Sequence, residues 1–161
     1  MTHLEIGGGT APRAGYLQLD PVHGVGEMRR RVQEGIPLDD NVADRALASH
    51  VLEHIPAGPD RITTFNEIHR VLKPGGVFEI VVPLIGYSDE EWKPRPVHGW
   101  QPFADPTHVS VFWFPESLLY FCEAGYLPSA DYGIRRWAPL ERDAWYVKDG
   151  WEGFAVLRKP G

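Results

Sequence analysis

Short apolar runs that end at glycine or at acidic residues mark the first half of the chain. One run spans His3–Ile6 and stops at a glycine, and a second spans Tyr16–Leu19 and stops at Asp20-Pro21. Each run has the length of a buried strand and is followed by turn residues. Residues 42–52 carry Ala and Leu with polar residues between them, and we expect a third strand there that runs into a loop.

Apolar residues at helical spacing predict a helix after this loop. Asp60 can cap its first turn, and Lys73 followed by Pro-Gly-Gly ends it. The apolar run Val77–Val82 then predicts a buried strand that Pro83 closes. The apolar face of the helix consists of Ile62, Phe65, Ile68, Val71 and Leu72.

The pattern is less regular in the second half of the chain. Residues 86–106 are rich in proline and aromatic side chains, and we expect a long loop that packs as a lid. Residues 115–124 predict a helix with proline at its first position and glycine just past its end. Two further strands are expected at 131–137 and 153–159, on either side of a turn at 149–150.

The order of these elements predicts an α/β fold. Three strands, a helix, a strand, a helix and two final strands are typical of a largely parallel sheet, here with an antiparallel C-terminal strand. Residues 25–34 fit neither the helical nor the strand period, and we expect a strand edge and a loop there. Ligands of such sheets bind beyond the carboxyl ends of the strands, where the first glycines and the first acidic residues fall.

Composition and charge narrow the function classes. The 161 residues form one domain by length and carry a formal net charge of -6, which makes nucleic acid an improbable partner. Cys122 is the only cysteine, so neither an internal disulfide nor a cysteine-based zinc cluster can form. We expect no signal peptide, because a strand-like run begins within three residues of Met1, and no apolar run approaches the roughly 20 residues that cross a bilayer. We expect a cytoplasmic protein without a membrane partner.

The stretch Leu4–Asp20 combines an acidic residue, a glycine turn and a second acidic residue at the end of the next strand. A dinucleotide site fits poorly, because Pro12 stands where a third glycine is needed and Asp20 follows Gly9 by only eleven positions. A nucleoside fits better, with its ribose hydroxyls on the second acid and its remaining part over the glycine backbone. S-adenosylmethionine is a ligand of this kind.

An ordered series of motifs resembles the class I S-adenosylmethionine-dependent methyltransferases, specifically small members of the methyltransferase-11 kind. The motifs are "LEIGGG", "LQLD", "IPLDDNVADRALASHVLEHI" and "FNEIHRVLKPGGVFEIVVP" within residues 4–83, followed by "DPTH" and "FPESLLYFCEAGY". The resemblance implies a Rossmann-like sheet and S-adenosylmethionine as cofactor. It divides the single domain 1–161 into a cofactor-binding half (1–83), a long substrate or lid loop (84–114) and a C-terminal helix with strands (115–161).

The resemblance also implies which residues hold the cofactor. Asp20 would bind the ribose hydroxyls. Gln33 or the backbone would stand in for an acidic residue that often binds the adenine amino group. The turn glycines allow the backbone to approach the ligand, since a Cβ would keep it away. The full set of expected cofactor residues is Glu5, Gly7, Gly8, Gly9, Asp20, Gln33, Ser49 and His50.

One departure from the family pattern concerns the layer that covers the sheet. The usual helix between the first two strands is reduced to about "TAPRAG", a single turn or a loop. In this minimal form of the fold, one face of the sheet loses part of the layer that usually covers it. We expect either the tryptophan-rich C-terminal half or a partner chain, such as a second copy in a homodimer, to lie over that face.

The segment "HVLEH" formally matches H-x-x-E-H, a zinc-peptidase arrangement on a helix. Pro56, Gly58 and Pro59 leave little more than one turn, so we expect no metal there. In the methyltransferase interpretation His50 is the first candidate for a catalytic base and His108 the second. For both residues, hydrogen bonds that merely hold the loop are an equally good explanation.

The long loop supplies candidates for an acceptor site. The expected substrate-binding residues are His98, Trp100, Asp105, His108 and Trp113, although these aromatic residues can equally complete a small core. The resemblance implies transfer of a methyl group to a small-molecule or sugar-like hydroxyl acceptor. The alternative is a non-catalytic module of the same fold that binds the cofactor or a partner protein.

Overall fold

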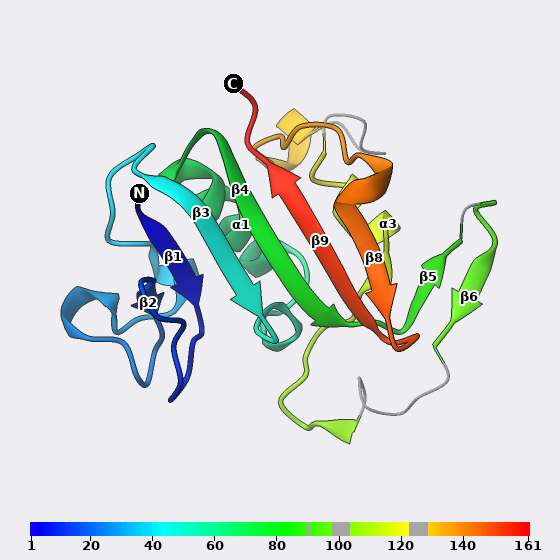
Figure 1. The fold of residues 1–161 in the computed structure, drawn as a ribbon, viewed down its shortest axis with the longest axis horizontal. Helices are drawn as coiled ribbons and strands as arrows, with labels where there is room; N and C mark the ends of the chain where they lie inside the picture. Colours follow the sequence, from blue (N-terminus) through cyan, green and yellow to red (C-terminus); the bar gives the residue numbers. More distant parts are fainter. Residues whose placement is uncertain (90, 98–103, 123–128) are drawn as a thin grey trace.

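A computed structural model describes residues 1–89, 91–97, 104–122 and 129–161. Its central sheet runs diagonally across Figure 1. In sheet order the strands are β2 (Leu17–Leu19), β1 (His3–Ile6), β3 (Ala43–Ser49), β4 (Leu72–Pro83), β9 (Glu152–Arg158) and β8 (Trp145–Lys148). Two α-helices, α1 (Pro59–Val71) and α3 (Glu116–Leu119), complete the regular framework of the described residues together with short 3-10 turns.

Strand directions confirm the predicted α/β class. Strand β1 pairs in parallel with β2 and β3, and β3 pairs in parallel with β4. Strand β9 is antiparallel to both β4 and β8. The carboxyl ends of β1, β2, β3 and β4 therefore meet at one edge of the sheet, as expected for a Rossmann-like fold.

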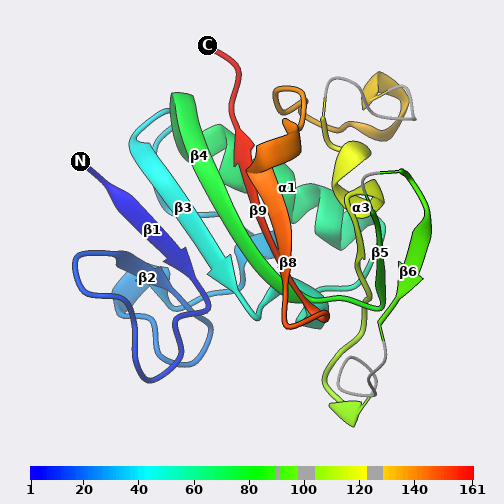
Figure 2. The same ribbon diagram turned by 45° about the vertical axis from the view of Figure 1, so that its right-hand side comes forward.

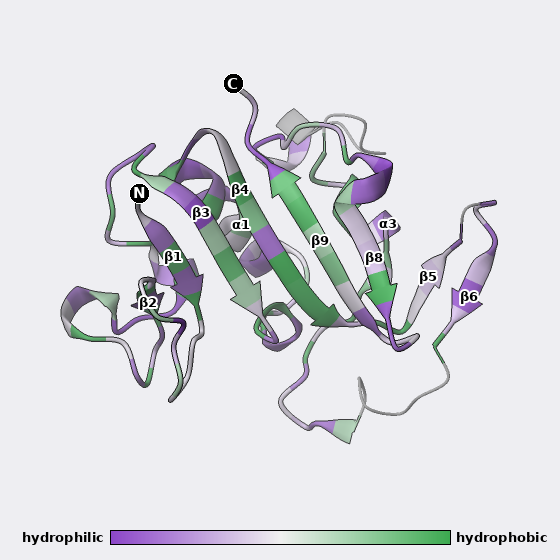
Figure 3. Ribbon diagram, in the orientation of Figure 1, coloured by the Kyte–Doolittle hydropathy of each residue, from purple (hydrophilic) through white to green (hydrophobic). Residues whose placement is uncertain are grey.

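The core lies between the sheet and the two α-helices, which occupy the same side of the sheet in Figures 1 and 2. Phe65 of α1 stacks on Phe121 with ring centroids 3.9 Å apart and meets Phe78 of β4 edge to face. Figure 3 shows hydrophobic residues concentrated in β3, β4 and β9. Burying each such phenylalanine side chain contributes about 2–3 kcal/mol to folding.

The opposite face of the sheet has less cover. The connection between β1 and β2 is a loop, as predicted, and no α-helix of the described parts of the chain lies over this face. Val156 is 38% exposed there, and Tyr146 stacks on Phe154 at 4.8 Å. The expected cover by the C-terminal half is thus limited to the β8–β9 edge.

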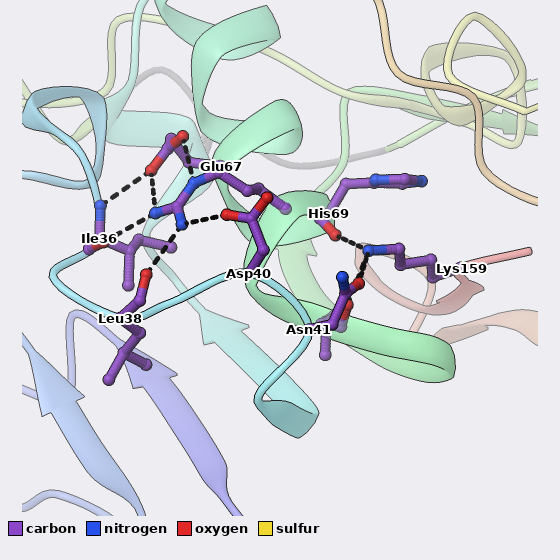
Figure 4. Close-up of polar contacts among 9 residues, drawn as sticks. Ile36, Leu38, Asp40, Asn41, Glu67, His69 and Lys159 are labelled. Carbon is purple, nitrogen blue, oxygen red and sulfur yellow. Dashed lines mark hydrogen bonds and ion pairs between the residues drawn. The ribbon is translucent and has the colours of Figure 1, made fainter.

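Helix α1 is held to the preceding loop by Arg70. Its guanidinium binds the Glu67 carboxylate, the Asp40 carboxylate and the backbone carbonyls of Ile36 and Leu38, all between 2.8 and 2.9 Å (Figure 4). The hydrogen bonds to Glu67, followed by those to Asp40, raise the pKa of Arg70 above its ordinary value despite partial burial. We call this group the Arg70 cluster.

A second polar contact ties the C-terminus to the same region. The Lys159 ammonium group donates to the Asn41 side chain and to the carbonyls of His69 and Leu72 (Figure 4). Among the described residues, no helix is long and apolar enough to cross a membrane.

Several predicted elements need correction. Residues 131–137 form no strand apart from a single bridge at Trp137, whose side chain is fully buried in the core. The strand before the turn is β8 instead, where inward and outward side chains alternate. Residues 25–34 contain two 3-10 turns, η1 (Gly26–Met28) and η2 (Val32–Glu34), in place of a strand edge.

The remaining boundaries differ in detail. Helix α1 begins after Gly58 without a side-chain cap, and Leu72 already belongs to β4. The expected helix at 115–124 is confined to α3 within its described part. The expected loop at 86–106 contains β5 (Gly86–Ser88) and β6 (Pro94–Pro96), which form a small sheet with β7 (Trp113–Phe114).

Candidate functional site

The glycine turn after β1 lies directly beside the end of β2. The Gly7 amide donates to the Leu19 carbonyl at 2.8 Å, and the Gly9 amide donates to Oδ2 of Asp20 at 3.1 Å. Gly7 has a φ of +70°, and a Cβ at this position would lie 2.5 Å from Cγ2 of Val51. Both the backbone conformation and the space therefore require glycine.

Asp20 is a buried carboxylate that backbone amides hold in place by hydrogen bonds. Only 6% of the residue is exposed, and Oδ1 accepts hydrogen bonds from the amides of Val22 and His23 at 2.8 and 2.7 Å. Burial raises the pKa of Asp20, but the hydrogen bonds from His23, Val22 and Gly9 together outweigh it and lower the pKa below its ordinary value. Three of the carboxylate's roughly four acceptor positions are used, which leaves capacity for a ligand hydroxyl.

Glu5 stabilises the shortened connection between the strands. Its carboxylate accepts a hydrogen bond from the Arg13 amide at 2.6 Å, and a Cβ on Gly8 would lie 2.9 Å from its Oε2. Gln18 adds a bond from its side-chain amide to the Gly9 carbonyl at 2.6 Å. These contacts fix the turn in the absence of a helix, and a role of Glu5 or Gly8 toward the cofactor stays a prediction.

A cavity of about 400 Å³ opens at this edge of the sheet. We call it the strand-end pocket. Of the expected cofactor residues, Gly7 and Gln33 line it, whereas Glu5, Gly8, Gly9, Asp20, Ser49 and His50 lie at the same edge without lining it. Its full lining is Ile6, Gly7, Leu19, Pro21, Arg30, Arg31, Val32, Gln33, Val51, His54, Ile55, Pro56, Asp60 and Val109.

His50 follows β3 and binds two carboxylates. Its Nε2 lies 2.7 Å from Oε1 of Glu152, and its Nδ1 lies 3.4 Å from Oε1 of Glu53. Glu53, and more weakly Glu152, raise the pKa of His50 against the effect of partial burial. The two carboxylates therefore favour the protonated imidazolium form of His50. His50 can act as a base only in its neutral form, after it has released this proton.

His108 lies close to the same glutamate. Its Nε2 is 3.9 Å from Oε1 of Glu53 and 3.7 Å from Oδ2 of Asp105. The backbone amides of Val109 and Ser110 donate to the Glu53 carbonyl at 2.9 and 3.1 Å, which holds this loop against η3 (Leu52–His54). The structure thus brings both predicted histidines to one buried carboxylate.

The other predicted acceptor residues do not gather in this pocket. Asp105 accepts hydrogen bonds from the amide and hydroxyl of Thr107, so its carboxylate orders its own loop. Trp113 packs against Gly86 in the small sheet and is not among the residues that line the strand-end pocket. His98 and Trp100 lie outside the described residues.

Sequence reasoning missed several residues that line the pocket. Val51 follows β3 directly, and its position next to an expected strand end is a signal that could have found it. Val109 and His54 meet only because the loop after residue 104 folds back onto η3, which no local pattern indicates. Arg30 and Arg31 also line the pocket, and nothing in the sequence distinguishes them from ordinary surface charges.

Comparisons with known proteins agree with this geometry. Residues 21–80 match the model of a methyltransferase domain family. A search of curated proteins found no match. The structural comparisons below concern the whole chain.

Three solved structures illustrate the shared fold. The Burkholderia thailandensis 1,6-didemethyltoxoflavin-N1-methyltransferase, solved with S-adenosylhomocysteine, has a TM-score of 0.58 at 20% identity and covers 99% of this chain and 71% of its own. The Bacillus subtilis YcgJ protein has a TM-score of 0.61 at 15% identity, with coverages of 99% and 92%. A chain from a complex with the Haloferax volcanii Trm112 methyltransferase activator has a TM-score of 0.52 at 18% identity, with coverages of 99% and 83%.

At these identities the structural likeness establishes the fold, and the family match begins just after β2 and ends within β4. In this fold the parallel strand ends bring the glycine turn and the buried Asp20 together at one edge of the sheet. The chain therefore shares the fold of these methyltransferase structures, and residues 21–80 match the model of a methyltransferase domain family.

Proposed function

We propose that this protein binds S-adenosylmethionine in the strand-end pocket and transfers its methyl group to a small-molecule acceptor. The observation that carries the proposal is the contact between the glycine turn and Asp20. A bare backbone at Gly7 and an ionised, partly satisfied carboxylate lie side by side at the ends of β1 and β2.

The residues around the pocket suggest how each part of the cofactor is held. Asp20 would accept hydrogen bonds from the ribose hydroxyls, and the glycine turn would pass close to the methionine part. Val32 and Gln33 line the pocket beyond β2, where an adenine ring would lie. When bound, the sulfonium supplies an activated methyl group, and the chain contributes alignment and exclusion of water.

The acceptor is proposed to be a small molecule or a sugar-like hydroxyl. A net charge of -6 disfavours a nucleic-acid acceptor, and the Burkholderia thailandensis neighbour was solved with the small molecule 1,6-didemethyltoxoflavin bound. For a hydroxyl acceptor, His50 and His108 are the candidate proton acceptors, since both lie at the carboxyl end of β3 near Glu53.

Calorimetry with S-adenosylmethionine and S-adenosylhomocysteine tests the cofactor site. We expect micromolar binding of both ligands by the full chain, and a loss of at least about tenfold in affinity for Asp20→Ala, because each hydrogen bond to a charged group contributes about 1.5–3 kcal/mol. Asp39→Asn is the matched control, since Asp39 is exposed and is not among the residues that line the pocket.

A non-catalytic module that binds a partner is the second candidate, favoured by the poorly covered face of the sheet. A homodimer would bury the exposed part of Val156 and the neighbouring Tyr146. If calorimetry detects neither ligand and light scattering shows a dimer, this second candidate replaces the enzyme. A monomer that binds both ligands would contradict it.

A further inference from the structure

The side chain of Glu53 is the most unusual polar group near the pocket. It is 1% exposed, and neither of its carboxylate oxygens has a hydrogen-bond partner among the residues that the structure describes. A buried carboxylate is costly unless a positive charge or several donors compensate it. The His50 imidazole compensates this charge only in part, because its Nδ1 lies 3.4 Å from Oε1 of Glu53 and its Nε2 is paired with Glu152. A further cation or a proton would stabilise the carboxylate.

Besides His50, two histidines from different segments lie close to this carboxylate. The ligand atoms of Glu53, His54 and His108 all lie within 4.8 Å of one another. The rings of His54 and His108 meet edge to face with centroids 4.8 Å apart. The amides of Val109 and Ser110 bind the Glu53 carbonyl, so the backbone already holds the two segments together.

The hydrogen bonds of His54 determine which ring nitrogen is available. Its Nδ1 lies 3.2 Å from the Thr107 carbonyl oxygen and 3.0 Å from the Thr107 hydroxyl. A carbonyl only accepts, so Nδ1 carries the hydrogen and Nε2 presents a lone pair. Metal-binding histidines commonly donate their second ring N–H to a backbone carbonyl in this way.

We propose that Glu53, His54 and His108 bind one divalent transition-metal ion of the zinc class. Two imidazoles and one carboxylate form a donor set that holds Zn²⁺ with a position left open. His54 also lines the strand-end pocket, so the ion lies at the pocket wall. This set differs from the H-x-x-E-H pattern, because His50 binds Glu152 and the second imidazole comes from His108.

The proposal is tested on the full chain after removal of metal with a chelator. Titration with Zn²⁺ should show about one equivalent bound, and Glu53→Gln and His108→Ala should each weaken binding at least about tenfold, since loss of an outer partner alone costs 10–100-fold. His23→Ala is the matched control, because His23 is exposed and outside the cluster. Zn²⁺ should raise the melting temperature of the wild type and of this control only.

Two results would overturn the proposal. One is a wild type that binds no Zn²⁺, and the other is binding that Glu53→Gln and His108→Ala leave unchanged. Should either variant fail to fold by circular dichroism, X-ray absorption of the zinc-loaded wild type decides. Two imidazole nitrogens and a carboxylate oxygen at about 2.0–2.2 Å support the site, and any other donor set contradicts it.

Discussion

At the scale of single residues, Gly7 shows how local backbone geometry creates a ligand site. Its positive φ is unfavourable for other residues, and Val51 occupies the space where a side chain would begin. Gly9 also has a positive φ, but nothing lies within 4 Å of the position of its Cβ. Gly9 therefore shows the effect of backbone conformation alone, whereas Gly7 combines that effect with steric crowding.

This difference predicts unequal effects of alanine. Gly9→Ala should cost about 1–2 kcal/mol in the free energy of unfolding, the cost of a left-handed conformation. Gly7→Ala should cost roughly 1–3 kcal/mol more, because its methyl group would overlap Val51. Urea denaturation measures both values. Equal losses for the two variants would show that Val51 moves aside freely.

At the scale of elements, the Arg70 cluster holds α1 to the loop that leads into β3. Arg70→Met would remove the cation that pairs with Glu67 and the donor to two backbone carbonyls, leaving Glu67 only the Ile36 amide, and we expect a loss of about 3 kcal/mol in the free energy of unfolding. Arg45→Met is the control, because the Arg45–Glu79 pair is half exposed and should contribute less than about 1 kcal/mol. Chemical denaturation that finds equal losses would contradict the special role of Arg70.

The elements also show what sequence patterns can and cannot predict. The strands at 3–6 and 77–82 and helix α1 were predicted, because their apolar periodicity is local and strong. The strand expected at 131–137 was wrong, because the buried Trp137 serves the core without joining a ladder of several residues. Tertiary packing, and not the local sequence pattern, determined the backbone conformation of residues 131–137.

The candidate site was predictable to a similar extent. The glycine turn and Asp20 were placed correctly relative to each other, because both follow directly from strand ends. The approach of His108 to Glu53 was not predictable, because it depends on a loop more than fifty residues away along the chain. The packing of Trp113 on Gly86 in the small sheet was not predictable either, and its role in binding substrate stays a prediction.

At the scale of the whole molecule, stability should depend on pH through His69. Burial, followed by the charge of Lys159, lowers the pKa of His69 to about 4, and its Nε2–H donates to the Arg136 carbonyl. The native state keeps this ring neutral, whereas the unfolded chain takes up a proton below its ordinary pKa of 6.5. Stability is therefore full above that pH and falls as pH decreases from 6.5 toward 4.

The loss should be on the order of 2 kcal/mol, less than the full shift would give because the ring is partly exposed. Urea denaturation across this pH range measures it. His69→Gln should show a flatter dependence than the wild type, and an identical slope would mean that other groups govern acid stability.

The whole account depends on the strand-end pocket being the place where the adenosyl cofactor binds. A crystal structure of the full chain with S-adenosylhomocysteine tests this most directly. The account predicts ribose hydroxyls within hydrogen-bond distance of Asp20 and the homocysteine part against the turn at Gly7. A pocket that stays empty at saturating ligand, or a ligand bound elsewhere on the sheet, would contradict it.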